Sequence, residues 1–284
     1  MPEDKASDKR RKMSLSEQLT YSTVQIRRFN ADKFTGSGTG FIINLRENKE
    51  KKGGEPFLVT NKHVVADTTH VSFELCRADE NRNPIDTDAI PFSITRNQWI
   101  DHPDPNVDLC CTPLGALLNI ATLQGVAPFW VSLAQSLIPS AETIETIMAL
   151  EEVVMVGYPK GLEDFHNHKP IMRRGVTATH PKNDYQGKKE ILLDIAAFPG
   201  SSGSPVFILN QGTYSTPNGF TMSLPPRIFL LGILYGGPEF EVNGTLKFSE
   251  LPNIPTPVTK LPINLGIIIK AERIREFETL FNNA

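Results

Sequence analysis

Three side chains of this sequence have the types and surroundings that nucleophilic acyl transfer requires. Ser202 lies in AAFPGSSGSPVF, His63 in FLVTNKHVVAD and Asp108 in PNVDLCC. A serine hydroxyl is a poor nucleophile unless a base takes its proton and N–H groups stabilise the oxyanion that forms. Such a site needs a serine on a tight turn, a histidine, an acid that orients the histidine, and free N–H groups. The sequence offers a candidate for each.

The glycines on either side of Ser202 predict a sharp turn. Gly200 and Gly203 allow backbone N–H groups to converge on one point, and the N–H groups of Gly200 and Ser202 would form an oxyanion hole. An ordinary Ser/Gly hairpin loop explains the same letters. In the same way, His63 alone fits a structural histidine and Asp108 alone fits a turn carboxylate.

Other histidines are weaker candidates for chemistry. His102 is a rival base, but its Pro-flanked loop lacks the apolar strand that precedes His63. His166 and His168 could bind a metal, yet their polar loop offers no third ligand nearby. We therefore expect neither a metal nor another cofactor.

Short apolar or β-branched runs, separated by Gly, Pro and Asn turns, predict an all-β fold. Twelve such runs fall into two sets of six, which suggests two small barrels packed side by side. The first set is 22–28, 39–44, 57–60, 70–75, 91–95 and 109–112, and the second is 153–157, 171–179, 190–195, 205–209, 228–235 and 266–270.

The segments around these runs complete the predicted organisation. Ile274, Phe277 and Leu280 are spaced as on one face of a terminal helix. The remaining expectations are a disordered tail over 1–19, a first barrel within 20–125, a second unit over 126–284, a crossover at 118–148, a charged hairpin tip at 46–55, long loops at 210–227 and 236–262, and the helix at 271–281.

Composition limits the function classes. The chain has 284 residues, 39% hydrophobic and 21% charged, with a net charge of −3, which argues against broad capture of nucleic acid. No apolar run approaches the roughly 18 residues that a membrane helix needs. Cys76 and the adjacent Cys110 and Cys111 form no disulfide framework, and the charged N-terminus lacks a secretory signal. These features favour a cytoplasmic protein, with Cys110 and Cys111 buried rather than reactive.

The combined order of the motifs resembles the trypsin-like serine proteases of chymotrypsin fold. TNKHVV, the Asp108–Leu109 pair and GSSGSP follow in the order His, Asp, Ser, while GSGTGFII and VGYPKGL resemble the bacterial HtrA-like branch. The resemblance covers about residues 20–275 and implies two six-stranded antiparallel barrels with a short C-terminal helix. It also implies a catalytic triad of His63, Asp108 and Ser202 acting on a polypeptide.

The resemblance also places a specificity pocket. Its floor would be Ala196 with Ala197 beside it, so no carboxylate is present to select Arg or Lys. Leu234 stands where glutamyl-specific relatives have a histidine, which argues against selection of Glu. Gly237 and Gly266 would leave the walls open, so we expect an uncharged, small-to-medium apolar residue at the cleaved position.

Neighbouring positions receive roles by the same resemblance. The stretch Tyr235, Gly236 and Gly237 would pair with a substrate strand. Ser201 replaces the aspartate that pairs with a new N-terminus in chymotrypsin itself, so activation by N-terminal trimming is not expected. Ser204 is expected to pack in the turn.

The sequence leaves alternatives open. A latent or inactive trypsin-fold protein could act as a binding or regulatory module, because the turn at 198–202 can flip and turn one oxyanion N–H away. An esterase could use the same triad. HtrA-like proteins usually carry a further peptide-binding PDZ domain, and its absence here suggests that a protein partner activates the enzyme or delivers its substrate.

Overall fold

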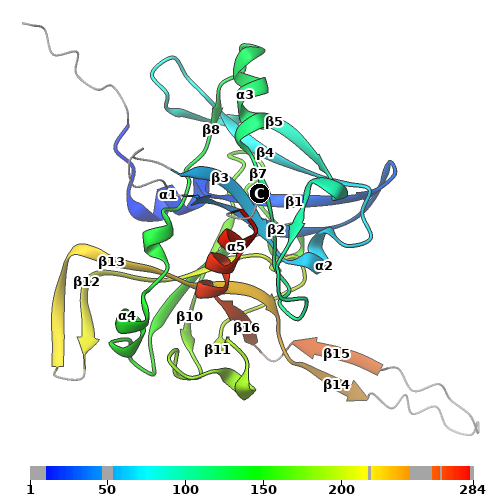
Figure 1. The fold of residues 1–284 in the computed structure, drawn as a ribbon. Coiled ribbons are helices and arrows are strands. Elements are labelled where there is room, and N and C mark those ends of the chain that lie inside the picture. The colour runs from blue at the N-terminus through cyan, green and yellow to red at the C-terminus, as the bar shows by residue number, and fades with distance from the viewer. Residues whose placement is uncertain (1–10, 47–53, 217–218, 244–257, 263, 282–284) are drawn as a thin grey trace, which may run out of the picture.

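Two β-sheet units, one above the other in Figure 1, make up the computed structural model of the chain. The structure describes residues 11–46, 54–216, 219–243, 258–262 and 264–281. The predicted all-β class is confirmed, and all twelve predicted strands are present.

The N-terminal unit is an eight-stranded sheet of order β5-β4-β1-β2-β3-β7-β6, in which β8 pairs with β4. It differs from the expected six-stranded barrel because its described path ends at β5 and β6 without closing. The two additional strands are only two residues long, too short to give a sequence pattern. The strands are β1 (Thr23–Asn30), β2 (Lys33–Leu45), β3 (Glu55–Thr60), β4 (His70–Ala78), β5 (Pro84–Thr95), β6 (Ile100–Asp101), β7 (Cys110–Pro113) and β8 (Pro128–Phe129).

The C-terminal unit is the closed, six-stranded antiparallel barrel that was expected, of order β10-β11-β16-β13-β12-β9. A separate two-stranded sheet joins β14 and β15. The strands are β9 (Glu152–Gly157), β10 (Ile171–Thr177), β11 (Glu190–Asp194), β12 (Pro205–Thr216), β13 (Gly219–Gly236), β14 (Glu239–Asn243), β15 (Val258–Pro262) and β16 (Leu265–Lys270).

Two expected loops are largely strands. β12 and β13 continue past the barrel as a long hairpin, so the prediction of a loop over 210–227 was wrong. Its Pro and Thr residues are typical of loops, although the apolar Phe220 and Met222 alternate with the polar Thr221 and Ser223 as in a strand. Phe220 and Met222 are both exposed. The loop expected over 236–262 holds β14 and β15, and its residues 244–257 lie outside the described part, as do 47–53 of the expected hairpin tip.

Helices are short and connect the strands or lie near the ends of the chain. They are α1 (Leu15–Tyr21), α2 (Lys62–Val65), α3 (Gly115–Leu123), α4 (Ala141–Glu145) and α5 (Glu278–Phe281), with 3₁₀ turns η1 (Arg96–Gln98), η2 (Gln135–Leu137), η3 (Pro159–Gly161), η4 (Tyr185–Gly187) and η5 (Ala271–Phe277).

The first helix corrects the tail that was expected to be disordered over 1–19. Ser14 and Glu17 form a capping box at its start, and Leu19 and Tyr21 are buried. Residues 1–10 lie outside the described part. The terminal segment is η5 followed by α5 instead of one α-helix, but Ile274 and Phe277 are fully buried as their spacing predicted.

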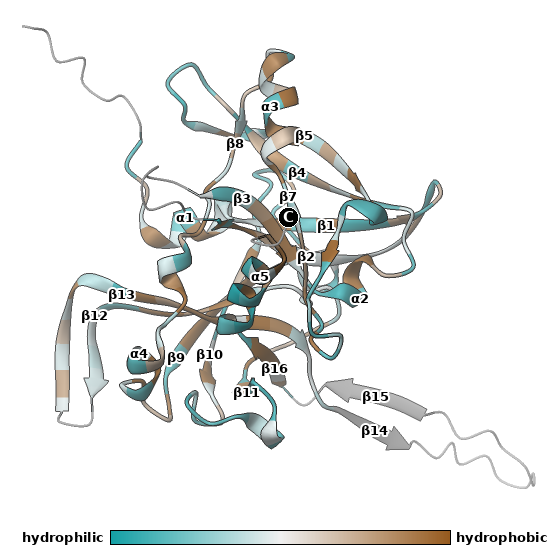
Figure 2. Ribbon diagram, in the orientation of Figure 1, coloured by the Kyte–Doolittle hydropathy of each residue, from teal (hydrophilic) through white to brown (hydrophobic). Residues whose placement is uncertain are grey.

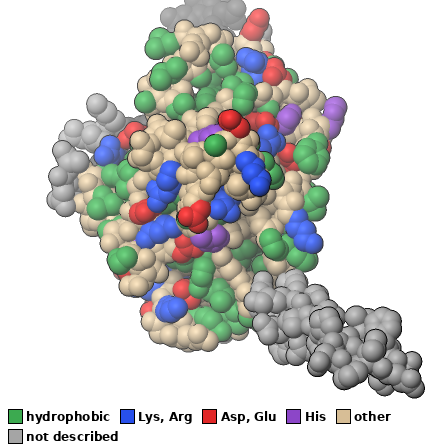
Figure 3. All heavy atoms as spheres, turned by 90° about the vertical axis from the view of Figure 1, so that its right-hand side faces the viewer, with side chains coloured by type: hydrophobic (Ala, Val, Ile, Leu, Met, Phe, Trp, Pro, Cys, Tyr) green, Lys and Arg blue, Asp and Glu red, His purple; other side chains and the backbone are tan. Residues whose placement is uncertain are grey.

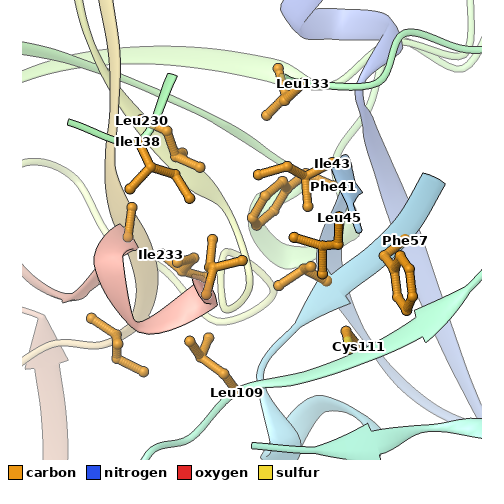
Figure 4. Packing of buried hydrophobic residues seen from close by; sticks show 14 of the residues in the cluster. Phe41, Ile43, Leu45, Phe57, Leu109, Cys111, Leu133, Ile138, Leu230 and Ile233 are labelled. Carbon is orange, nitrogen blue, oxygen red and sulfur yellow. The ribbon is translucent and has the colours of Figure 1, made fainter. Parts of the chain in front are cut away.

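Apolar side chains fill the space between the two units. Phe41 and Phe57 from the first sheet share one cluster with Ile233 from the barrel (Figure 4). Phe277 of η5 belongs to the same cluster. Hydrophobic residues, brown in Figure 2, concentrate near the centre of the molecule, and many of those on strands are fully buried. Full burial of one such side chain contributes about 1.5–3 kcal/mol. The shared core therefore fixes the two units relative to each other, and with them any site between them.

Candidate active site

Strand pairing brings His63 and Asp108 together. His63 lies in α2, directly after β3, and Asp108 lies just before β7, which pairs with β3. Nδ1 of His63 lies 2.5 Å from Oδ2 of Asp108, and the backbone N–H of His63 donates to Oδ1 at 3.0 Å. The amide of Asn61 donates to the Asp108 carbonyl at 2.8 Å. Oδ2 therefore orients the imidazole while Oδ1 holds the backbone of the same residue, and Nε2 is left for a reaction.

Strand β2 contacts both the helix that carries His63 and the Ser202 loop. A Cβ at Gly38 would be 2.5 Å from Cγ1 of Val64, the neighbour of His63. The next residue, Thr39, donates its backbone N–H to the Ser202 carbonyl at 2.8 Å. Consecutive residues of one strand thus contact the histidine helix and the serine loop, which places Ser202 in the same region as His63.

The Ser202 hydroxyl is not yet aligned with the imidazole. It donates a long hydrogen bond of 3.5 Å to the Tyr235 carbonyl, and within the described part of the chain no hydrogen bond joins it to His63. Catalytic hydrogen bonds are often long in unliganded enzymes and tighten when substrate binds.

Phe198 to Ser201 form a type II β-turn. The Ser201 N–H donates to the Phe198 carbonyl at 3.0 Å, Pro199 takes the second position and Gly200 has φ +88°. The Pro199 carbonyl accepts from the Lys160 N–H at 2.5 Å and so points away from the turn. A type I turn would need a negative φ at Gly200 and would reverse the peptide that joins Pro199 to Gly200.

This turn leaves two backbone donors free. Within the described residues, the N–H groups of Gly200 and Ser202 have no acceptor. A Cβ on Gly200 would lie 2.7 Å from the Tyr158 carbonyl and 2.8 Å from the Lys160 nitrogen. Only glycine fits there, and the two N–H groups can serve an oxyanion.

Thr39 and Arg173 support the turn from outside it. The fully buried hydroxyl of Thr39 donates to the Gly200 carbonyl and accepts from the Tyr158 N–H, both at 3.0 Å. Arg173 donates to the Ala196 carbonyl, and its guanidinium lies 4.8 Å from the Phe198 ring centroid. Sequence reasoning missed Thr39, Lys160 and Arg173 as site residues, because their contacts come from distant strands. Thr39 did lie in the GSGTGFII motif.

The positions expected to form the specificity pocket meet in part. A Cβ on Gly266 would lie 2.8 Å from Cδ1 of Leu234 and 3.5 Å from Cβ of Ala197, and one on Gly237 would overlap the Leu265 carbonyl. Ala197, Leu234, Gly237 and Gly266 are therefore neighbours. Ala196 contributes its carbonyl to Arg173.

A cavity of about 480 Å³ adjoins Asp108 and is also lined by Tyr235, Glu190 and Lys188. Burial is the larger cause, and a hydrogen bond to Glu190 the next, that raises the pKa of the Tyr235 phenol.

Acidic and basic side chains are interspersed across the face of the molecule in Figure 3, so no electrostatic field of one sign covers that face.

The remaining polar candidates have structural surroundings. His102 is buried, its Nε2 lies 2.9 Å from the Arg273 carbonyl, and burial lowers its pKa. His168 pairs with Glu74 at 3.4 Å. In the described part of the chain, no three His, Cys, Asp or Glu side chains gather as metal ligands.

The serines and cysteines beside the candidate triad are inaccessible. The hydroxyls of Ser201 and Ser204 are buried and have no partner in the described residues. Burial raises the pKa of the Cys110 and Cys111 thiols, which keeps them protonated. Neither pair adds a nucleophile to the site.

A family of known proteins matches the sequence of this chain. The sequence model of the trypsin-like peptidase domain matches residues 38–213, a span that includes His63, Asp108 and Ser202. None of the curated proteins searched matches the chain. Among solved structures, the HtrA-type protease AlgW, in a variant with a tripeptide, is 13% identical with a TM-score of 0.48. The alignment covers 93% of this chain and 60% of that one. No described helix is long and apolar enough to cross a membrane.

Proposed function

Because this chain belongs to the trypsin-like peptidase family, we propose that it is a serine endopeptidase with Ser202 as nucleophile. The observation that carries the proposal is the pairing of an oriented imidazole with a preformed turn. Both oxygens of Asp108 hold His63, and the type II turn leaves the N–H groups of Gly200 and Ser202 free.

Each group would then have one role. Nε2 of His63 takes the Ser202 proton as Oγ attacks the peptide carbonyl, and the two N–H groups stabilise the oxyanion. His63 next gives its proton to the leaving amine, and an acyl-enzyme remains on Ser202. Water, activated by the same imidazole, releases the acyl group. Asp108 keeps the imidazole in the required tautomer throughout.

The proposed substrate is a polypeptide strand that pairs with Tyr235–Gly237. Tyr235 falls at a register shift between β13 and β16, and its carbonyl faces the Ser202 hydroxyl. A Cβ on Gly236 would meet nothing within 4 Å, so a backbone can approach there. The neighbouring Ala197 and Gly266 favour an uncharged, small-to-medium apolar residue at the cleaved position. Cleavage of a peptide library tests this, and a preference for Arg, Lys or Glu there would contradict it.

Location and regulation are parts of the same proposal. Three free, buried cysteines suit a reducing, cytoplasmic setting, as in a bacterial cell. The proposal includes a protein partner that delivers substrate or activates the enzyme, with alignment of the Ser202 hydroxyl as the step that such a partner would promote. That hydroxyl also favours the second candidate, a latent trypsin-fold protein that acts as a binding or regulatory module.

Hydrolysis of unfolded casein and of fluorogenic peptides separates the two candidates. Wild type should release new amino termini, Ser202→Ala should lose about 10⁶-fold in kcat and Asp108→Asn about 10⁴-fold. Circular dichroism of each variant confirms that it is folded. A folded wild type that cleaves nothing, while Ser202→Ala still binds peptides, would favour the binding module.

A further inference from the structure

A second cavity lies beside the oxyanion turn. It has a volume of about 470 Å³, and its lining includes Gly200 and Pro199 of the turn, Lys160 and Gly161 of η3, and Arg28 of β1. It shares no lining residue with the cavity beside Asp108. The two cavities are therefore separate, with Tyr235 lining the first and Gly200 the second.

Cations line this cavity, and no carboxylate does. Arg27 is compensated, because it pairs with Glu74 at 2.7 Å and with Glu163 at 3.3 Å. Arg28 and Lys160 have no ion pair within the described part of the chain. The cavity therefore carries two uncompensated positive charges.

Arg28 is held in place with donors to spare. Its Nη2 donates to the Ala66 carbonyl at 3.1 Å, while its buried Nε has no partner among the described residues. Its Nη1 would lie 4.0 Å from a Cβ on Gly36, which also lines the cavity. Nε is buried and cannot reach a ligand, so Nη1 beside Gly36 is the group that could donate to a carboxylate in the cavity.

Lys160 combines an exposed charge with a fixed backbone. Its N–H donates to the Pro199 carbonyl, and its backbone is left-handed with φ +51°, as in seven other described non-glycine residues. Its ammonium lies 5.5 Å from the Phe198 ring centroid, a contact that leaves the charge open to solvent. A second anchor fixes η3, because Gln25 donates to the Gly161 carbonyl at 3.0 Å.

A bound substrate would reach this cavity with the residues that follow the cleaved bond. In the proposed complex, the substrate residues before the cleaved bond pair with Tyr235–Gly237, and the carbonyl of the cleaved bond lies at the N–H of Gly200. The substrate residues after the cleaved bond therefore continue past Gly200, away from Tyr235. An extended strand advances about 3.3 Å per residue, so the first three residues of the leaving segment come within reach.

We propose that Arg28 and Lys160 select substrates with an acidic side chain among the first three residues after the cleaved bond. This inference rests on the proposed peptidase function. It adds a charge preference on the leaving side to the apolar preference at the cleaved position. The pair acts in substrate binding, and the acid's carboxylate accepts hydrogen bonds from the guanidinium and the ammonium.

Matched peptides test the preference. Quenched fluorogenic peptides that differ only by Asp or Asn at the first, second or third position after the cleaved bond are compared by kcat/KM. We expect about fivefold faster cleavage of the Asp peptide at one position, the upper range for a solvent-exposed charge pair. The ratio should fall toward one at higher ionic strength.

Variants assign the preference to these residues. Lys160→Gln and Arg28→Gln should each lower the Asp/Asn ratio, and Lys160→Glu should bring it below one. Lys182→Gln is the matched control, since Lys182 pairs with Glu145 elsewhere and its loss should leave the ratio unchanged. Equal cleavage of all three peptide pairs by wild type, or a ratio that survives in both neutral variants, overturns the proposal.

A binding measurement separates this inference from the catalytic one. The same peptides, carrying a fluorophore, are titrated by anisotropy against Ser202→Ala, with and without Lys160→Gln. Tighter binding of the Asp peptide that depends on Lys160 supports the charged subsite even if wild type cleaves nothing. Equal binding of Asp and Asn peptides counts against it even if wild type cleaves both.

Discussion

Replacement of Gly200 by alanine tests the oxyanion turn. Gly200 has φ +88°, and a Cβ there would lie 2.7 Å from the Tyr158 carbonyl and 2.8 Å from the Lys160 nitrogen. A left-handed φ costs a residue with a Cβ roughly 1–2 kcal/mol, and overlap with fixed backbone adds about 1–3 kcal/mol. A flip to a type I turn relieves both costs.

The flip would disable one oxyanion donor. It points the Pro199 carbonyl where the Gly200 N–H had been and breaks its bond from Lys160. Loss of one such donor typically lowers kcat about 10²–10³-fold, or roughly 2.7–4 kcal/mol of barrier. We therefore expect Gly200→Ala to lose kcat by that factor while the relaxed turn keeps the protein folded.

Steady-state peptide hydrolysis and urea unfolding measure the two effects. Gly125→Ala is the matched control, because Gly125 has φ +76° and a Cβ there would meet nothing within 4 Å. It should lose about 1 kcal/mol of stability and keep its kcat. A folded Gly200→Ala enzyme with wild-type kcat would refute the assignment of the turn as an oxyanion hole.

Three further predictions concern residues around the site. Thr39→Val removes two buried hydrogen bonds of the turn, so it should lower the free energy of unfolding by about 2 kcal/mol and reduce kcat. Thr39→Ser keeps the hydroxyl and should retain both the stability and the kcat of wild type, and an equal loss in the two variants would assign the effect to packing. Burial raises the pKa of Glu163 above its ordinary 4.5 despite the nearby Arg27, so the free energy of unfolding of wild type should fall relative to that of Glu163→Gln as pH rises through the raised pKa. Urea unfolding below and above that pKa measures this difference, and a relative gain in wild-type stability would mean that the Arg27 ion pair outweighs burial. Because burial raises the pKa of the Cys110 and Cys111 thiols, alkylation of both should be limited by unfolding; rapid alkylation of the folded protein, detected by mass spectrometry, would contradict their burial.

The parts of the site that depend on local motifs could be predicted from the sequence. His63 follows a buried strand and Asp108 precedes another, so pairing of β3 with β7 brings them together. The Pro199–Gly200 pair is also a local signal, since it is typical of the middle of a type II turn and could have indicated the orientation that we left open.

Contacts between distant strands were beyond sequence reasoning. Thr39 supports a turn 161 residues later, and Lys160 holds Pro199 from another loop, so no spacing in the chain announces either. The extended β12–β13 hairpin was missed because its strands carry Pro, Gly and Thr, residues that usually mark loops. The helix at 15–21 was missed because seven residues with two buried apolar side chains are too few to give a clear helical periodicity.

The central claim is that Ser202 is a nucleophile activated by His63. A fluorophosphonate probe reacts with an activated serine, and peptide mapping by mass spectrometry identifies the modified residue. We predict one adduct, on Ser202, that disappears in Ser202→Ala and becomes much slower in His63→Ala. A folded protein that gains no adduct, or gains one on another residue, would contradict the account.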